Sequence, residues 1–230
     1  MHIKKILLLI ILSYTNLFGS SLIVKENPII PYNIELVPTN KKVVSLTFDD
    51  GPNRNHTKKI LKILKKHRIN ATFFLIAKKS KAEPTIIKEI IKNGHEIGNH
   101  SYSHLPYTKL NEKDRLIDIA KSQDIFKHQL GYYPRYFRAP YGKINKTSIL
   151  ALKRFYKHHI GWTIDPKDWE NKKENVTHYI SDNIQPGAII LLHETSDKTL
   201  ELLPEIILKL KSEGYAIVTI SKLIEEYDTF

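Results

Sequence analysis

The feature that most constrains the fold is an alternation of apolar segments with amphipathic ones, about seven times along the chain. The apolar segments predict strands, namely residues 43–50, 71–77, 95–99, 136–141, 158–164, 188–192 and 215–219. Apolar strands that are each followed by an amphipathic helix are typical of a parallel sheet covered by helices. The alternation therefore predicts an α/β fold, and seven or eight such units can close into a barrel.

Helices are expected between these strands, where apolar residues recur at helical spacing. The predicted helices are residues 56–68, 84–92, 111–130, 146–155, 176–184 and 200–211. Pro84 suits the first turn of its helix, and Ser221 is expected to cap a last short helix.

The first 21 residues have the plan of a secretory signal peptide, because a basic start precedes an apolar run and then small residues. We therefore expect export to the periplasm, the cell wall or the medium. If Leu17 and Phe18 prevent cleavage, the segment would remain as a membrane anchor. Residues 22–41 carry three prolines and are interpreted as an extended lead-in, which leaves residues 42–230 as a single domain.

The chain has a net charge of +12, and loss of the leader with its two lysines would lower it to +10. Lysines are spread over predicted helices such as 58–66, and a diffuse positive surface favours anionic partners such as wall polymers or phospholipid headgroups. The alternative is that these lysines are only solvated helix surface. The sequence has no nucleic-acid-binding motif, so no nucleic-acid partner is expected.

The absence of cysteine restricts the chemistry that the chain can use. It excludes disulfides, thiolate zinc sites, a cysteine nucleophile and a lipid anchor on cysteine. Any metal must therefore be held by nitrogen and oxygen ligands.

The first predicted strand ends in two adjacent carboxylates, Asp49 and Asp50, before Gly51 and Pro52. Acids are rarely buried without a partner or a metal, and side chains alternate in direction along a strand. One acid could therefore hold a metal while the other handles a proton. The alternative is a pair of solvated acids in an ordinary turn.

Polar residues also follow the other predicted strands, and the active site of an α/β barrel lies at the carboxyl ends of its strands. These residues are His100, His104, Arg138, Asp165, Asp168, Trp169 and His193. We expect them to converge with the two acids on one cleft. Two imidazoles and one carboxylate give three ligands and leave positions open, as in a catalytic zinc site, although cobalt, nickel or iron would also fit.

The chain resembles the polysaccharide deacetylase family, the NodB-homology carbohydrate esterases. The resemblance spans about residues 41–226 and rests on five motifs in order, TFDDGP at 47–52, HSYSH at 100–104, RAPYG at 138–142, DPKDW at 165–169 and LLH at 191–193. It implies a distorted (β/α) barrel with about seven parallel strands. It also implies a metal-dependent hydrolase that removes acetyl groups from polysaccharides.

The family's central roles fall on matching positions of this chain. The resemblance implies that Asp50, His100 and His104 bind the metal, with zinc as the expected ion. It makes Asp49 the general base that takes a proton from the attacking water. It makes His193 the general acid that protonates the leaving amine.

Supporting roles follow from the same motifs. The resemblance implies that Arg138 orients the base and that Asp168 holds the network of Arg138 and the acid. The backbone amide of Tyr141 would help to hold the oxyanion. Trp169 and Leu191 would form apolar walls near the acetyl group.

The leading hypothesis is an exported, monomeric N-deacetylase that acts on peptidoglycan N-acetylglucosamine or on chitin oligosaccharides. The alternatives are an O-acetyl esterase of the xylan type and a non-catalytic protein that binds the cell wall. The remaining histidines are interpreted as structural or surface residues, namely His95, His158, His159 and His178.

Overall fold

The computed structural model describes residues 31–156, 158–170 and 176–227. The predicted signal peptide, residues 1–21, lies outside these residues, as does the first part of the predicted lead-in, residues 22–30. Within the described ranges, no helix is long and apolar enough to cross a membrane.

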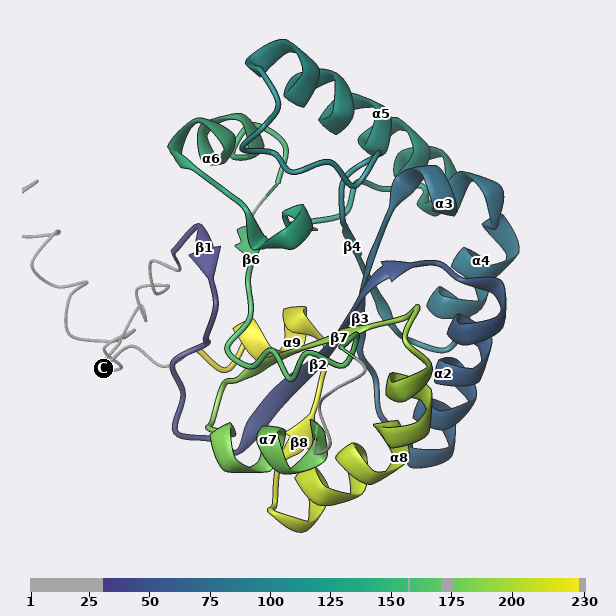
Figure 1. Cartoon of the computed structure of the whole chain (residues 1–230), viewed down its shortest axis with the longest axis vertical. Helices are drawn as coiled ribbons and strands as arrows, with labels where there is room; N and C mark the ends of the chain where they lie inside the picture. Colours follow the sequence, from purple (N-terminus) through teal and green to yellow (C-terminus); the bar gives the residue numbers. More distant parts are fainter. Residues whose placement is uncertain (1–30, 157, 171–175, 228–230) are drawn as a thin grey trace, which may run out of the picture.

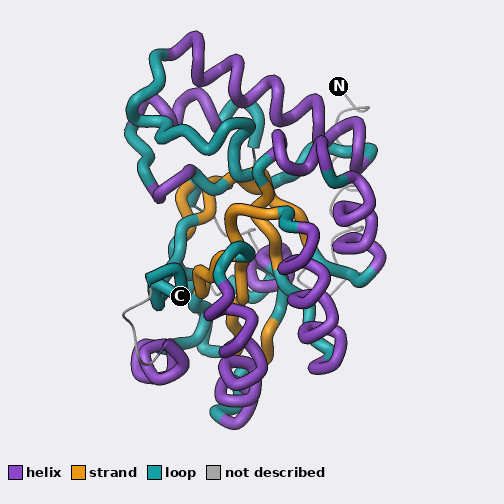
Figure 2. The backbone as a smooth tube through the Cα atoms, turned by 45° about the vertical axis from the view of Figure 1, so that its right-hand side comes forward, coloured by secondary structure: helices purple, strands orange, loops and turns teal. Residues whose placement is uncertain are grey.

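Eight short strands of the described chain form the sheet, and every pairing between them is parallel. They are β1 (Asn33–Ile34), β2 (Val43–Gly51), β3 (Thr72–Leu75), β4 (Glu96–Asn99), β5 (Tyr136–Phe137), β6 (His158–Ile160), β7 (Ile189–His193) and β8 (Ala216–Ile217). The order is β1-β6-β5-β4-β3-β2-β7, and β8 pairs with β2. The sheet curls into a half-barrel with helices around its outside (Figures 1 and 2), which confirms the predicted distorted barrel.

The helices connect successive strands and cover the outer face of the sheet (Figure 2). They are α2 (Arg54–His67), α3 (Ala77–Ala82), α4 (Pro84–Lys92), α5 (Glu112–Leu130), α6 (Lys146–Leu152), α7 (Val176–Asn183), α8 (Asp197–Ser212) and α9 (Ile220–Ile224).

Strand β2, which pairs with β3, β7 and β8, shows why the sequence forms a covered parallel sheet. Every side chain from Val43 to Asp49 is buried, so both faces of the strand are packed. Outside it, α2 buries Ile60, Leu61 and Leu64 in the main hydrophobic core. Apolar spacing therefore fixes which face of the helix meets the sheet.

Isolated bridges, rather than a continuous ladder, join the two ends of the half-barrel. Leu36, just after β1, bridges to Ala188, just before β7, and Ile164 bridges to Ile190. The end strand β1 belongs to the predicted lead-in and pairs with β6, so this part of the lead-in packs directly on the sheet.

One strand is much shorter than the sequence predicts. The apolar run predicts a strand over residues 136–141, but β5 ends at Phe137 and a 3-10 turn, η1 (Pro140–Gly142), follows. Pro140 has no N–H to donate to a ladder, and Tyr141 has a φ of 60°. The chain therefore turns away from the sheet immediately after Arg138.

Three further predictions are wrong in detail. The expected helix 146–155 ends at Leu152, and the expected strand 158–164 ends at Ile160. The last helix is capped by Thr219 rather than Ser221, whose hydroxyl bonds instead to the carboxylate of Glu96.

Candidate active site

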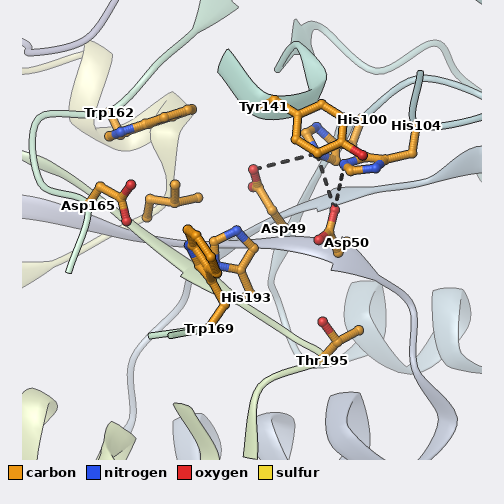
Figure 3. A pocket seen from close by; sticks show the side chains of 11 residues that line it. Asp49, Asp50, His100, His104, Tyr141, Trp162, Asp165, Trp169, His193 and Thr195 are labelled. Carbon is orange, nitrogen blue, oxygen red and sulfur yellow. Dashed lines mark ion pairs between the residues drawn. The ribbon is translucent and has the colours of Figure 1, made fainter. Parts of the chain in front are cut away.

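A cavity of about 400 Å³ opens at the carboxyl ends of the strands. Most of its lining comes from the five motifs (Figure 3). The lining residues are Asp49, Asp50, His100, His104, Tyr141, Trp162, Asp165, Trp169, Leu191, His193 and Thr195. The strand ends therefore converge on one cleft, as the sequence predicts, while Arg138 and Asp168 are buried behind the lining.

Three of the lining residues could hold a metal ion together. Within the described chain, Asp50, His100 and His104 form the one group whose ligand atoms all lie within 4.8 Å of one another. The Nε2 atom of His104 lies 2.9 Å from Oδ1 of Asp50, and that of His100 lies 3.4 Å from the same oxygen. The fold thus brings together the three residues that the sequence predicts as ligands.

The surroundings of these ligands fit a divalent cation. Burial would raise the pKa of Asp50, but hydrogen bonds from His100 and His104 and their charges hold it well below its usual range. The Nδ1 atom of His100 bonds to the carbonyl oxygen of Arg138 at 2.8 Å, which leaves Nε2 to face the ligand cluster. One anionic oxygen and two imidazole nitrogens are donors that zinc and similar ions accept.

The backbone around the ligands adopts conformations that residues other than glycine rarely take. Positive φ angles occur at Asp50 (71°), Ser101 (70°), His104 (60°) and Tyr141 (60°). In addition, the pairing of β2 with β3 shifts register between Asp49 and Gly51. Such strain persists only where the surrounding structure enforces it, and here it gathers around the ligand cluster.

The second acid of the pair is held by a buried arginine. Asp49 is 3% exposed, and its Oδ1 atom accepts a hydrogen bond from Nη1 of Arg138 at 2.7 Å. The guanidinium also donates to Thr47 and to the carbonyl oxygens of Ile160 and Gly161. These bonds fix one oxygen of Asp49, and the other faces the cavity beside the ligand cluster (Figure 3).

The opposite histidine is held by Asp168. Nδ1 of His193 lies 2.7 Å from Oδ1 of Asp168, whose Oδ2 accepts the backbone N–H of His193, also at 2.7 Å. Asp168 accepts a further bond from the hydroxyl of Thr199. In the described structure Asp168 makes no hydrogen bond with Arg138, so the expected link between these two residues is wrong. Arg138 holds Asp49, and Asp168 separately holds His193.

The environment of His193 favours its charged form. Burial lowers the pKa of His193, but the hydrogen bond and charge of Asp168, with the carboxylates of Asp49 and Asp50, outweigh burial and raise it. A histidine in this setting keeps a proton that it can donate.

Trp169 and Leu191, the two residues expected at the walls, both line the cavity, and so does Tyr141, whose backbone amide is expected near the oxyanion. Tyr141 and Trp169 are 60% and 57% exposed, whereas Leu191 is buried. The ring of Tyr141 packs against that of His104, with ring centres 4.7 Å apart. The two exposed rings could contact a bound sugar.

The other histidines do not line this cavity. His95, His158 and His159 are buried. Burial lowers the pKa of His95 to about 4 and, with the charges of Arg138 and His100, lowers that of His159 to about 3. His178 is exposed on α7. Their positions, three buried and one exposed, agree with the interpretation of these histidines as structural or surface residues.

A buried acid outside the motifs positions the loop that carries the two histidine ligands. Asp118 on α5 is 6% exposed, and it accepts the N–H groups of Tyr102 and Ser103 and the hydroxyls of Ser103 and Tyr107. Reasoning from the sequence did not identify this residue. A signal was present, because helical spacing places Asp118 on the same face as Ser122 and Phe126, which are buried.

Replacing Asp118 by asparagine is expected to weaken zinc binding about 10-fold or more, the usual effect of losing a residue that orients metal ligands. The amide retains the volume of Asp118, but its NH2 group cannot accept the bonds from Ser103. Competition with a chromogenic chelator measures the zinc dissociation constant.

Asp124 provides the matched control, because it lies on the same helix and is exposed. Asp124→Asn should bind zinc like the unaltered protein. Equal zinc affinity in both variants would refute the positioning role of Asp118.

A second buried acid supports the loop that carries Asp50. Glu194 is fully buried, accepts a hydrogen bond from the hydroxyl of Thr57, and donates its backbone N–H to the carbonyl oxygen of Asp49 at 3.0 Å. Burial raises the pKa of its carboxyl to about 8. A Cβ atom at Gly51 would lie 1.8 Å from this carboxyl, so any larger residue there would displace the side chain of Glu194.

Comparison with known proteins agrees with the family resemblance seen in the sequence. The polysaccharide deacetylase family model matches residues 36–159. Over 193 residues the chain is 36% identical to a peptidoglycan-N-acetylglucosamine deacetylase of Bacillus cereus, a match that covers 82% of this chain and 70% of the relative. It is 38% identical to the peptidoglycan-N-acetylmuramic acid deacetylase PdaC of Bacillus subtilis, but spans only 40% of that longer protein.

Solved structures share the fold. The crystal structure of the Bc1960 peptidoglycan N-acetylglucosamine deacetylase matches with a TM-score of 0.80 and 36% identity, over 84% of this chain and 93% of that one. A CE4 family pseudoenzyme from Bacillus anthracis also matches with a TM-score of 0.80, at 32% identity, over 86% and 70% of the two chains. The chain belongs to the polysaccharide deacetylase family of hydrolases.

Proposed function

We propose that this chain is an exported, zinc-dependent enzyme that removes N-acetyl groups from the amino sugars of peptidoglycan. One observation carries the proposal. A carboxylate held by a buried arginine and a histidine held by a buried aspartate share one cavity with a cluster of three candidate metal ligands.

The reaction would hydrolyse an amide, so that its C–N bond breaks, a C–O bond forms, and acetate and a free amine leave. A divalent cation held by Asp50, His100 and His104 would supply Lewis-acid chemistry, which activates water and polarises a carbonyl group. The proton transfers of the reaction would be carried out by acid and base side chains of the protein.

Asp49 would act as the base. Its Oδ1 atom is engaged by Arg138, which leaves Oδ2 to take a proton from a water molecule in the cavity. The buried guanidinium also compensates the charge of the carboxylate, because a buried acid is stable only when it is paired. Arg138 is therefore a positioning residue rather than a group that touches substrate.

His193 would act as the acid. Its Nδ1 atom is held by Asp168, so Nε2 is the atom that can give a proton to the leaving nitrogen. An amine leaves poorly unless it is protonated, which makes a proton donor on this side necessary. The backbone N–H of Tyr141 completes the proposal as a donor to the developing oxyanion.

The choice of peptidoglycan rests on the two Bacillus relatives, both of which carry peptidoglycan substrates in their names. A chitooligosaccharide deacetylase of Azorhizobium caulinodans is 34% identical over 160 residues, so chitin oligosaccharides are the second candidate. The Xyl-CE4 domain of a multidomain xylanase is 29% identical to this chain and matches it with a TM-score of 0.73. Acetylated xylan is therefore the third candidate substrate.

A non-catalytic wall-binding protein is the competing class, because the chain is also similar to a pseudoenzyme. A binding protein has no need for a base, an acid and their separate buried partners. This chain has Asp49 with Arg138 and His193 with Asp168, each pair joined at 2.7 Å. These pairs favour catalysis.

Acetate release by the purified protein tests the proposed substrate. N-acetylglucosamine oligomers, peptidoglycan fragments and acetylated xylan should be offered side by side under the same conditions. We expect the fastest release from peptidoglycan fragments. Faster acetate release from acetylated xylan would indicate that the natural substrate is an O-acetyl ester rather than an N-acetyl amide. No acetate release from any of the three substrates would favour a non-catalytic wall-binding protein.

Replacing His193 by alanine should reduce hydrolysis of amides at least ~100-fold, the scale of general acid catalysis, and reduce hydrolysis of an activated acetyl ester much less. A good leaving group departs without a proton, so the ester does not need the acid. His178→Ala, at an exposed histidine on α7, is the control and should leave both rates unchanged. Equal losses on amide and ester would contradict the role of His193.

Export is part of the proposal and rests on the plan of residues 1–21. N-terminal sequencing of the protein made by its own host tests it. A mature chain that begins near residue 21 or 22 and lies outside the cytoplasm is expected. A cytoplasmic protein that still begins with Met1 would refute export.

A further inference from the structure

The positive charge of this chain is concentrated in one segment, in contrast to the diffuse surface expected from the sequence. Residues 54–92 contain twelve lysines and arginines but only two acids, Glu83 and Glu89. The whole chain has 36 basic and 24 acidic residues, so removing this segment leaves 24 and 22. Nearly all of the net charge of +12 therefore lies in 39 consecutive residues.

This segment forms one side of the molecule. It comprises α2, β3, α3 and α4, and the three helices lie together on the right-hand side of Figure 1. All twelve cationic side chains are exposed, namely Arg54, Lys58, Lys59, Lys62, Lys65, Lys66, Arg68, Lys78, Lys79, Lys81, Lys88 and Lys92. We call the surface formed by these twelve residues the basic face.

The charge of the basic face is poorly neutralised by the protein itself. In the described structure, the ion pairs of this face are Arg54 with Glu83 at 3.0 Å and Lys58 with Glu89 at 3.7 Å. Both acids of the segment are thereby used. The other ten cations have no carboxylate within ion-pair distance among the described residues.

Helix α2 shows that this arrangement opposes helix stability. Its 14 residues contain no acid, and Lys58, Lys62 and Lys66 follow one another at four-residue spacing on one face. Like charges at this spacing repel and destabilise a helix. A bound polyanion would relieve this repulsion. A helix that only faced solvent would be more stable with acids between the lysines.

The composition of the basic face indicates the chemistry of its partner. Ten of the twelve cations are lysine, which binds phosphate as a compact point charge, whereas arginine offers a planar fork to carboxylate and phosphate alike. The three helices carry no Phe, Tyr or Trp on which bases could stack, which disfavours single-stranded nucleic acid. Ile91 is their one exposed large apolar residue, which disfavours insertion into a membrane surface.

We propose that the basic face docks the enzyme on a phosphate-bearing polymer of the cell envelope. The inference rests on the proposed function in one respect, because it assumes that the protein meets such a polymer outside the cytoplasm. The face adjoins the candidate active site, since α2 begins directly after the motif at 47–52 and Lys79 donates to the carbonyl oxygen of Asp50 at 2.8 Å. A polymer bound there would keep the cavity close to the wall polysaccharide.

Binding to long-chain inorganic polyphosphate tests the proposal with a probe that contains phosphate and no sugar or lipid. The full mature protein should bind it at about 0.1 M salt, and binding should weaken steeply as salt rises. The test variant replaces Lys59, Lys62 and Lys66 by glutamine, which is a good helix former and removes three charges. We expect its affinity to fall about 10-fold or more.

The control variant removes the same number of charges elsewhere. Lys109, Lys113 and Lys146 are exposed and lie outside the basic face, so their replacement by glutamine should change affinity less than about 3-fold. Equal losses in the two variants would show that only net charge matters and would overturn the proposal. Thermal unfolding of both variants verifies that each is folded.

Two further probes separate the partner classes. Polyglutamate offers carboxylates, and vesicles of phosphatidylglycerol offer phosphate on a lipid surface. Tighter binding to polyphosphate than to either supports the proposal, and equal or tighter binding to either overturns it. The Asp50→Ala variant should still bind polyphosphate, so a failure of catalysis is distinguishable from a failure of docking.

Discussion

Replacing Asp49 by asparagine will lower the turnover of the enzyme on an N-acetylated oligomer at least ~100-fold, while the protein retains its zinc. Asparagine has the shape of aspartate and can still accept the hydrogen bond from Arg138. It cannot take a proton from water. Because Asp49 is outside the three-ligand group, the loss should appear in the rate and not in the zinc content.

Two measurements on the same preparation decide this prediction, namely steady-state acetate release and zinc content by atomic emission. Arg138→Lys provides a comparison, because it keeps a positive charge and removes the fork that orients the base. Its rate should lie between those of Asp49→Asn and the unaltered enzyme. Asp49→Asn with more than a tenth of normal turnover would exclude Asp49 as the base.

Replacing Asp50 or His104 by alanine will abolish both bound zinc and measurable acetate release. Each change removes one of three donors, and Asp50 supplies the only anionic one within the group. A site with two donors holds a metal far more weakly, because zinc sites in enzymes use three protein ligands. Zinc content after dialysis and acetate release report the two effects separately.

Asp165→Ala is the matched control for these variants. Asp165 is an acid that lines the same cavity but does not belong to the ligand group. This variant should bind zinc like the unaltered protein. A loss of zinc equal to that of Asp50→Ala would mean that the ligand group has been assigned wrongly.

The fold was predictable because buried parallel strands have a simple sequence pattern. The run at 188–192 is wholly apolar, and it forms most of β7, whose residues 189–192 are all buried. The weak closure of the barrel was not predictable, since it depends on single bridges such as that of Leu36 with Ala188. Helix α3 was missed because it buries only Ala77 and Ser80 and so lacks an apolar period.

The candidate site was predictable where chemistry marks the residues. Paired acids at a strand end and histidines four residues apart indicate a candidate metal site, and the resemblance to the family assigns its ligands. Of the supporting acids, Asp118 could have been suspected from the helix face that it shares with Ser122 and Phe126. Glu194 was not predictable, because it resembles a solvated loop residue in the sequence and its burial depends on the packing of distant segments. The positive φ of Tyr141 left no trace in the sequence either.

The most direct test of the central claim is acetate release from a peptidoglycan fragment by the mature protein, first after chelation and then after addition of one equivalent of zinc. We predict no release from the chelated protein and recovery of the original rate with zinc. Release that persists after complete removal of metal would contradict a metal-dependent deacetylase. Zinc bound at the site without any acetate release would contradict the assignment of this chain as an active enzyme on that substrate.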